Sequence, residues 1–419
     1  MINKYYDSDC NFAMLDGKTV AILGFGVVGS GVAEVLSGNG AGIQKKADEL
    51  IEVKYILDVR DFPDSPFAKH FVKDFSVIEN DPEVTVVAEV MGGVGAAYQF
   101  TKRCLEAGKS VCTSNKELVA KHGPELLQIA REHNCNYLFE ASVGGGIPII
   151  RPLNYSLTAE KIEAINGILN GTTNYILSKM EKEGADFAAV LKEAQDKGYA
   201  ERNPEADVEG YDACRKIAIL SSLMFSKNVD SEKVPTEGIT KITVADFEYA
   251  NATDHTIKLL GRSRAIDDNT AEVMVAPFLL SKEHPLAMVH GVFNAVFVTG
   301  NMLGDSMYYG RGAGKLPTAS AVVSDVVDCA RHQGKVIMCF WDKEEVKLAD
   351  IGEAERSFFI RAKAGAEDAV TAAFPGGRMV HLKDRKEDFG YFTQSMKEKD
   401  FQAKYEALGG QMLGRIRLV

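Results

Sequence analysis

A glycine-rich segment near the start of the chain, Gly24-Phe25-Gly26-Val27-Val28-Gly29, places the strongest constraint on the fold. It follows an apolar run at residues 19–23, which predicts a buried strand, and it precedes a predicted helix at residues 28–36. Between a strand and a helix, one glycine makes the tight turn, one lets a pyrophosphate approach the backbone, and one lets helix and strand pack closely. The free N–H groups at the helix start then face the phosphates. The pattern predicts a dinucleotide-binding site, with a glycine-rich turn before an ordinary helix as the alternative.

The first 140 residues alternate predicted strands and helices. The strands are expected at residues 19–23, 53–59, 84–91, 110–113 and 136–139. The helices are expected at 28–36, 96–107 and 125–133, with a short helix before the last one and a glycine-rich break at 38–42. Such alternation predicts a parallel sheet with helices on both faces and ligands at the carboxyl ends of the strands. We assign residues 1–140 to a Rossmann-type dinucleotide-binding domain, closed by a helix at 317–335.

Beyond residue 150 the pattern changes. Strands are expected at residues 162–169, 257–264, 272–280 and 294–301, and helices at 173–182, 187–197 and 212–225. This mixture predicts an α+β domain over residues 141–316, built on a mostly antiparallel or mixed sheet. Residues 350–419 follow the order β-α-β-β-α-β, the ferredoxin-like arrangement, and we expect them to form a small self-contained domain. The fold class predicted for the whole chain is α/β with three domains.

Composition excludes several classes of protein. Of the 419 residues, 46% are hydrophobic and 26% charged, which is ordinary for a globular protein. No apolar run is long enough to span a bilayer, and the first residues lack the basic and apolar regions of a secretory signal. The seven cysteines are scattered and form no C-x-x-C pair, which favours reduced thiols in a cytoplasm. A net charge of −11 argues against nucleic-acid binding.

Four further motifs follow the glycine-rich segment along residues 18–335. They are Thr113-Ser114-Asn115-Lys116, then the loop from Glu140 to Ile149, then Asn170-Gly171-Thr172-Thr173-Asn174-Tyr175, and finally Gly198-Tyr199-Ala200-Glu201 through Lys216. Gly312-Ala313-Gly314, with the helix that follows it, closes the series. Together these motifs resemble homoserine dehydrogenase. The resemblance implies reversible NAD(P)-dependent interconversion of L-aspartate 4-semialdehyde and L-homoserine in threonine, methionine and isoleucine biosynthesis. It also implies that residues 141–316 form the catalytic and dimerisation domain of a homodimer or homotetramer.

Lys116 is the first of two candidate catalytic residues. Ser114 and Glu117 have the spacing of a capping box, so Lys116 is expected in the first turn of a helix. The positive end of the helix dipole there lowers the affinity of a lysine for its proton. A lysine that extends into solvent at a helix start is the alternative. The resemblance assigns Lys116 to catalysis and to cofactor binding.

Lys216 is the second candidate. Asp212 and Lys216 are four residues apart and share a helix face, where a modest surface ion pair is the alternative reading. Acids at positions 201, 207 and 212 could hold a substrate ammonium and orient a lysine. The resemblance makes Lys216 the general acid–base, and it places the substrate amino acid against Glu201, Asp212, Asp207 and Thr172.

Cofactor contacts are expected at the ends of several strands. They are Gly24, Phe25, Gly26, Val27, Val28 and Gly29, with Arg60, Gly92, Gly93, Lys116 and Gly314. The end of the second strand contains both an acid, which suits a ribose hydroxyl, and Arg60, which suits a 2′-phosphate. The sequence therefore slightly favours NADP over NAD, with dual use expected.

The loop at residues 140–147 and the final domain raise two further expectations. The loop offers oxygen ligands, which suit hard cations. The resemblance implies a structural monovalent cation, commonly sodium, held by Glu140, Val143, Gly145 and Ile147. A glycine-rich hinge is the alternative.

The final domain resembles an ACT module, which binds amino acids, but it lacks the usual Asp-x-Pro-Gly-like turn. A degenerate module used for assembly is the alternative there.

Overall fold

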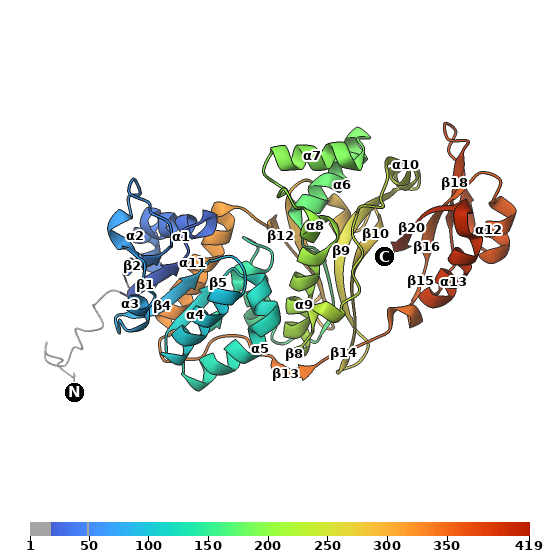
Figure 1. Cartoon of the computed structure of the whole chain (residues 1–419). Helices are drawn as coiled ribbons and strands as arrows, with labels where there is room; N and C mark the ends of the chain where they lie inside the picture. The colour runs from blue at the N-terminus through green and yellow to red at the C-terminus, as the bar shows by residue number, and fades with distance from the viewer. Residues whose placement is uncertain (1–17, 48–49) are drawn as a thin grey trace, which may run out of the picture. The chain divides into compact units, whose positions relative to one another are not determined.

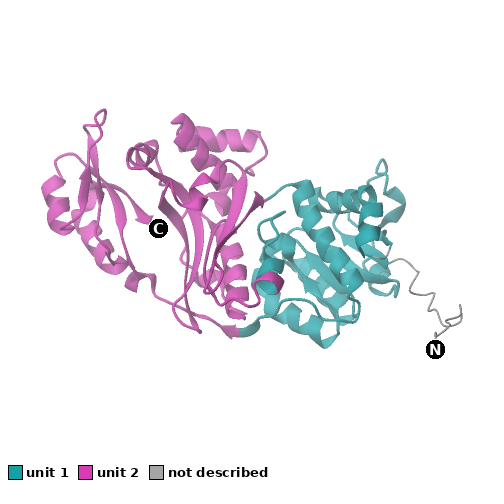
Figure 2. Ribbon diagram, turned by 180° about the vertical axis from the view of Figure 1, so that it is seen from behind, with its two compact units in different colours: residues 1–154, 313–343 teal, residues 155–312, 344–419 magenta. Residues whose placement is uncertain are grey.

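The computed structural model describes residues 18–47 and 50–419. They form two compact units, drawn in different colours in Figure 2. The first unit contains the described residues up to 154 together with residues 313–343, and the second contains residues 155–312 and 344–419. The chain therefore leaves the first unit, builds most of the second, and returns once. No helix among the described residues is both long and apolar enough to cross a membrane.

The first unit contains a six-stranded sheet in which every strand pairs in parallel with its neighbours. Its order is β3-β2-β1-β4-β5-β6, the doubly wound order whose reversal between β1 and β4 creates a ligand crevice. The strands are β1 (Lys18–Leu23), β2 (Ile51–Leu57), β3 (Phe71–Val72), β4 (Val84–Glu89), β5 (Ser110–Thr113) and β6 (Tyr137–Leu138). The predicted parallel α/β architecture is confirmed.

Helices cover this sheet (Figure 1). They are α1 (Val27–Gly38), α2 (Gly40–Ala47), α3 (Ser76–Glu79), α4 (Gly95–Glu106), α5 (Lys116–Glu132) and α11 (Lys315–Arg331). Helix α11 comes from the returning chain and packs with α1 and the central strands in one buried apolar cluster. Gly31 makes this close packing possible, because a Cβ at that position would lie 2.9 Å from the Cβ of Ala319.

Two predicted interruptions of this unit were wrong. The glycine-rich break at 38–42 contains the start of α2, because Asn39 separates α1 from α2 and the second helix begins at Gly40. The short and long helices expected after β5 are a single helix, α5, with Pro124 inside it. The bare Gly123 surface accommodates the buried Trp341, since a Cβ there would lie 2.5 Å from the indole ring. Pro124 cannot donate a helix hydrogen bond, and α5 nevertheless continues through it to Glu132.

The second unit is built on a mixed sheet of ten strands, as predicted. Its order is β12-β11-β7-β9-β10-β20-β16-β18-β17, with β14 also paired to β10. The strands of its first part are β7 (Ile162–Ile168), β9 (His255–Ala265), β10 (Thr270–Ser281), β11 (Phe293–Gly300), β12 (Gly304–Arg311) and β14 (Lys347–Leu348). The sequence analysis missed β12, an edge strand in which no side chain is fully buried.

Helices α6 (Gly171–Glu183) and α9 (Tyr211–Phe225) contact β9 and its neighbours, and Figure 1 shows them beside α7 (Phe187–Asp196) and α8 (Glu205–Val208). The unit also contains α10 (Val244–Ala252) and the short strands β8 (Lys227–Asn228), β15 (Glu355–Arg356) and β19 (Met396–Lys397). A further short strand, β13 (Asp342–Glu345), follows the return of the chain from the first unit. Of these helices, α6, α8 and α9 carry the candidate substrate residues.

The final segment has the predicted ferredoxin-like element order: β16 (Phe358–Lys363), α12 (Glu367–Ala373), β17 (Arg378–Val380), β18 (Asp388–Phe392), α13 (Glu398–Leu408) and β20 (Met412–Leu418). Its four strands are antiparallel in the order β20-β16-β18-β17, around a separate aromatic core. The expectation of a self-contained sheet was wrong, because β20 pairs in parallel with β10 at Phe278 and Leu279. This pairing satisfies backbone groups that the edge strand β20 would otherwise expose.

Candidate active site

The three glycines of the first motif differ in their surroundings. Gly24 has a φ of +94°, the left-handed conformation that glycine adopts without strain. A Cβ on Gly29 would lie 1.9 Å from the carbonyl oxygen of Gly24, so only glycine allows α1 to pack this close to β1. Gly26, the N-cap of α1, has no atom within 4 Å of its Cβ position and no capping side chain. The backbone at Gly26 is therefore open to a phosphate group, while the other two glycines shape the turn.

At the end of β2, the carboxylate of Asp58 is hydrogen-bonded within the protein, whereas the side chain of Arg60 is exposed. The carboxylate of Asp58 accepts hydrogen bonds from the backbone N–H of Phe25 at 2.7 Å and from the guanidinium of Arg60 at 3.0 Å. The Arg60 guanidinium holds the pKa of Asp58 well below its usual range. The Arg60 side chain remains 59% exposed and lies over the ring of Phe62. Asp58 therefore anchors the glycine loop and orients Arg60.

Lys73 adds a second cation at this strand end. Its ammonium donates to the carbonyl oxygens of Asp58, Val59 and Arg60 at 2.6–3.1 Å, and the side chain is half exposed. The sequence analysis missed Lys73, because no motif connects it with the end of β2. Its ammonium also forms an ion pair with Asp61 at 2.8 Å. Lys73 therefore lies beside Arg60 at the strand end where an adenosine ribose lies in doubly wound folds, with its charge partly compensated by the protein.

Lys116 is the first residue of α5, as predicted, but the predicted capping residue was wrong. Asn115 is the N-cap, and its side-chain oxygen accepts a hydrogen bond from the N–H of Leu118 at 3.1 Å. Its amide nitrogen also donates to the carbonyl of Gly93 at 2.7 Å, a second bond that a Ser114 hydroxyl does not make here. Asn115 therefore fixes the position of Lys116 relative to Gly92 and Gly93.

A buried carboxyl group supports this arrangement. Glu89, at the end of β4, is fully buried and accepts hydrogen bonds from the Thr113 hydroxyl at 2.6 Å and from the N–H of Met91 at 2.8 Å. The Thr113 hydroxyl in turn accepts from the N–H of Asn115. Burial raises the pKa of Glu89 to about 7. The sequence analysis missed Glu89, although an acid at the end of an apolar strand was a visible signal.

The second unit brings three of the predicted site residues, Lys216, Asp212 and Asp207, into one hydrogen-bonded region. The buried ammonium of Lys216 donates to Asp212 and to the carbonyl oxygen of Leu169, both at 2.7 Å. Asn170, the N-cap of α6, donates to Asp207 at 2.7 Å and to Asp212 at 2.9 Å. Asn170 thus joins the start of α6 to both α8 and α9. Its connecting role was not predicted, although it lies within a recognised motif.

Thr172 and Glu201 occupy different environments in this region. The buried Thr172 hydroxyl donates to the carbonyl oxygen of Tyr199 at 2.7 Å, so it positions the loop after α7. Glu201 follows in that loop with an exposed side chain, and within the described part of the chain this side chain makes no hydrogen bond or ion pair. The structure therefore does not join Glu201 to the cluster around Lys216, and its carboxylate remains available to a ligand.

In the loop predicted to bind a cation, the carboxylate of Glu140 accepts hydrogen bonds from the backbone instead. Buried Glu140 accepts hydrogen bonds from the backbone N–H groups of Ile149, Ile150 and Arg151 at 2.6–2.9 Å. Most of its acceptor capacity is therefore occupied. Gly144 and Gly145 have positive φ angles, which turn the loop sharply. This geometry makes the side chain of Glu140 an anchor for the loop.

A doubly wound sheet with an open glycine turn, joined to a lysine–carboxylate cluster in a mixed-sheet unit, defines a nicotinamide-dependent oxidoreductase. Residues 148–327 match the family model for homoserine dehydrogenase, and residues 24–140 match the model for its NAD-binding domain. The chain belongs to the homoserine dehydrogenase family, whose members interconvert L-aspartate 4-semialdehyde and L-homoserine.

Similar proteins support this assignment over most of the chain. The homoserine dehydrogenase of Bacillus subtilis is 45% identical over 74% of this chain and 72% of its own length, and that of Helicobacter pylori is 40% identical over 84% and 83%. A crystal structure of a homoserine dehydrogenase from Thiobacillus denitrificans is 34% identical, with a TM-score of 0.88 over 96% of this chain and 98% of that one. A hyperthermophilic archaeal homoserine dehydrogenase in complex with NADPH is 26% identical, with a TM-score of 0.64 over 75% and 97%.

Proposed function

We propose that Lys216 is the general acid–base of the homoserine dehydrogenase reaction. The observation that carries the proposal is its placement: a buried ammonium held by Asp212 and by the Leu169 carbonyl. These partners use two of its three N–H donors, and among the described residues the third has no acceptor. A bound nicotinamide cofactor supplies hydride to the aldehyde carbon of the substrate. Lys216 then stabilises the developing alkoxide and transfers a proton to it.

Replacement of Lys216 by Met tests this role. We expect turnover of homoserine with NADP⁺ to fall by about 10²-fold or more, the usual scale for loss of acid–base catalysis. Binding of NADPH, followed by its fluorescence, should be unchanged because Lys216 belongs to the other unit. Near-normal turnover in Lys216→Met would rule out the role.

The same proposal assigns the neighbouring groups. Asp212 orients Lys216, and Asn170 fixes Asp212 and Asp207 by hydrogen bonds to both. The exposed Glu201 carboxylate binds the substrate ammonium. Thr172 positions the loop that carries Glu201. A Glu201→Gln variant should therefore raise the KM for homoserine and change kcat much less. A change confined to kcat would contradict the assignment.

On the nucleotide side, we propose that the open turn at Gly26 holds the pyrophosphate and that Gly93, Gly314 and Lys116 border the nicotinamide half. Gly314 has a φ of +122° and precedes α11, which carries no capping side chain at its start. Arg60 and Lys73 together support a preference for NADP, because Asp58 is already engaged by the protein. A monovalent cation, sodium, is proposed at the carbonyl oxygens of Val143, Gly145 and Ile147.

For assembly, we propose a homodimer or homotetramer in which the β12 edge takes part. Large apolar side chains are exposed on β12 and in the turn before it: Tyr309 of the strand at 52%, and Met302 and Leu303 of the turn at 80% and 59%. Exposed apolar groups on an unpaired strand edge favour association. A Leu303→Asp variant should shift the protein toward a smaller species in sedimentation.

We also propose a cytoplasmic location, consistent with the six described cysteines all being free thiols.

For the final segment, we propose an ACT-like module that serves assembly. Its ferredoxin-like order supports the likeness, and its pairing to β10 supports a structural role. Threonine inhibition of the intact protein would instead show a working effector site, and this can be measured in a standard turnover assay.

A further inference from the structure

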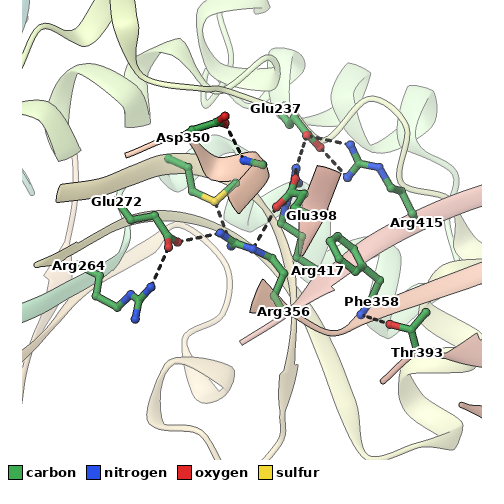
Figure 3. A network of polar contacts seen from close by, with 12 residues as sticks. Glu237, Arg264, Glu272, Asp350, Arg356, Phe358, Thr393, Glu398, Arg415 and Arg417 are labelled. Atoms are coloured by element: carbon green, nitrogen blue, oxygen red, sulfur yellow. Dashed lines mark hydrogen bonds and ion pairs between the residues drawn. The ribbon is translucent and has the colours of Figure 1, made fainter. Parts of the chain in front are cut away.

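Arg417 of β20 shows how a buried polar side chain is ordinarily accommodated in the second unit. In Figure 3 its guanidinium lies between two carboxylates: the Nε donates to Glu398 at 3.0 Å, and an ion pair joins the guanidinium to Glu237 at 2.7 Å. Native proteins pair nearly all of their buried polar groups, because a buried donor or acceptor without a partner lowers stability. An exception in the same unit therefore calls for a physical explanation.

Asn294, the second residue of β11, is such an exception. Its side chain is fully buried, and neither Oδ1 nor Nδ2 has a hydrogen-bond partner among the residues that the structure describes. Asn174 of α6 differs, although its Oδ1 is also unpaired. Its Nδ2 donates to the backbone carbonyl oxygens of Val289, Gly291 and Phe293 at 3.0–3.3 Å. The Asn174 amide thus anchors a loop, whereas the Asn294 amide bonds to nothing in the same neighbourhood.

The Asn294 amide lies between two glycine residues. A Cβ on Gly312 would lie 2.0 Å from Nδ2, and a Cβ on Gly171, the first residue of α6, would lie 3.4 Å from Oδ1. The amide therefore lies beside both backbones, yet it forms no hydrogen bond with either. Each backbone carries a donor and an acceptor, and glycine allows wide rotation of its peptide groups. A small rotation on each side would pair both ends of the amide.

These two glycines belong to the chain segments that carry candidate site residues. Gly171 follows Asn170, which donates a hydrogen bond to the carboxylate that holds Lys216. Gly312 is the residue at which the chain leaves the second unit, and Gly314 follows two residues later. Residues 312–314 are called the crossover below. Asn294 therefore borders both the start of the substrate helix and the segment that leads to the cofactor.

We propose that Asn294 is a positioning residue for the dehydrogenase reaction. In the complex with substrate and cofactor, its Oδ1 accepts a backbone N–H at the start of α6 and its Nδ2 donates to a backbone carbonyl oxygen of the crossover. It acts through the backbone, because a side chain with no exposed surface cannot touch the substrate. The unpaired amide destabilises the present conformation, and its pairing favours the complex, so ligand binding orders the crossover. The inference rests on the proposed roles of Lys216 and Gly314.

Replacement by leucine, which has a similar shape without polar atoms, tests whether the amide is unpaired in the protein without added ligands. We expect Asn294→Leu to unfold at the same urea concentration as the wild type or at a higher one, because two unpaired polar atoms are removed. Asn174→Leu is the matched control and should unfold at a lower concentration, because three backbone carbonyl oxygens lose a donor. An equal loss in both variants would show that Asn294 is already paired, and it would overturn the proposal.

Kinetics then test the role in the reaction. In Asn294→Leu, kcat for oxidation of homoserine with NADP⁺ should fall about tenfold, the scale of one or two lost hydrogen bonds, with little change in the Kd for NADPH alone. Asn294→Ala cannot clash with either glycine, so it should show the same loss and serves if the leucine variant does not fold. A merely structural role would lower stability and leave kcat unchanged. A wild-type kcat in Asn294→Ala therefore overturns the proposal.

Hydrogen exchange provides a readout that does not depend on catalysis. Saturation with NADPH and homoserine, a pair that cannot react, should slow exchange of the backbone N–H groups of residues 310–314 in the wild type and much less in Asn294→Ala. Unchanged exchange in the wild type, or equal slowing in both proteins, overturns the proposal. The slowing should persist in Lys216→Met. Normal turnover by Lys216→Met would refute its catalytic assignment without altering this exchange result, so the failures of the two proposals are distinguishable.

Discussion

The two candidate catalytic lysines are positioned in opposite ways. Lys116 is placed by the backbone, because it starts a helix whose cap, Asn115, is bonded to Gly93 and supported through Thr113 by Glu89. Lys216 is placed by its own ammonium, which contacts a carboxylate and a carbonyl oxygen. The position of Lys116 along its helix therefore depends on the helix cap and on the side chains that support this cap, whereas the ammonium of Lys216 is held directly by a carboxylate and a carbonyl oxygen. Substitutions on the nucleotide side and on the substrate side should therefore affect different measured properties.

The largest effect is expected at Lys216. Its removal should lower kcat by about 10²-fold or more and, because the buried carboxylate of Asp212 loses its ion pair with Lys216, should cost about 3–5 kcal/mol of stability. The double variant Lys216→Met/Asp212→Asn removes both charges of the ion pair, so it should recover most of the stability and none of the turnover. Urea unfolding and steady-state kinetics measure the two quantities. A double variant no more stable than the single one would show that the ion pair does not hold this region.

The next effect concerns the pH dependence of stability on the nucleotide side. Burial raises the pKa of Glu89 to about 7 from 4.5. The folded protein thus retains a proton that the unfolded chain has released between these pH values. The free energy of unfolding should therefore fall by about 3 kcal/mol in total as pH rises through this window. Outside the window, Glu89 should add no further pH dependence.

Replacement of Glu89 by Gln should remove this fall. Urea unfolding at pH 4.5 and pH 8 is expected to show the variant gaining on the wild type at the higher pH, while the exposed control Glu106→Gln follows the wild type. Parallel pH profiles for wild type and Glu89→Gln would show that Glu89 ionises in the folded protein as it does in the unfolded chain.

A pair of glycine variants separates packing from ligand contact. Gly29→Ala places a Cβ 1.9 Å from a backbone oxygen and should cost about 2–3 kcal/mol, with weaker NADPH binding as a consequence. Gly26→Ala meets no protein atom within 4 Å, so it should keep the stability of the wild type and still weaken NADPH binding. Thermal unfolding and fluorescence titration distinguish these outcomes. Normal NADPH binding by Gly26→Ala would place the pyrophosphate elsewhere.

The sequence predicted features that depend on local patterns. The glycine spacing and the alternation of elements predicted the parallel sheet, and the β-α-β-β-α-β order predicted the topology of the final segment. Features that depend on contacts between distant residues were not accessible. The close approach of Trp341 to Gly123 of α5 joins residues far apart in the chain, and the pairing of β20 with β10 requires an edge that only the folded sheet presents.

The same division holds at the candidate site. Lys216 and Asp212 were predicted as a pair because they are four residues apart on one helix. Asn170, Lys73 and Glu89 were missed as participants because each has a partner distant along the chain, 42, 13 and 24 residues away respectively. The place of Asn170 in a motif and that of Glu89 at a strand end were visible, but no local pattern identifies such a distant partner.

The smallest expected effect concerns the choice of cofactor. Arg60 is tied to Asp58 but remains largely exposed, so it can contact a 2′-phosphate while Asp58 keeps its role in the glycine loop. Arg60→Ala should lower kcat/KM with NADPH by about tenfold, the scale of one charged contact, and should change kcat/KM with NADH little. Lys73→Ala should act in the same direction, and Lys69→Ala, an exposed lysine of the neighbouring turn, serves as the control. An unchanged ratio of the two cofactors in Arg60→Ala would mean that the strand end is only an anchor for the loop, and the preference would then have to come from another part of the first unit.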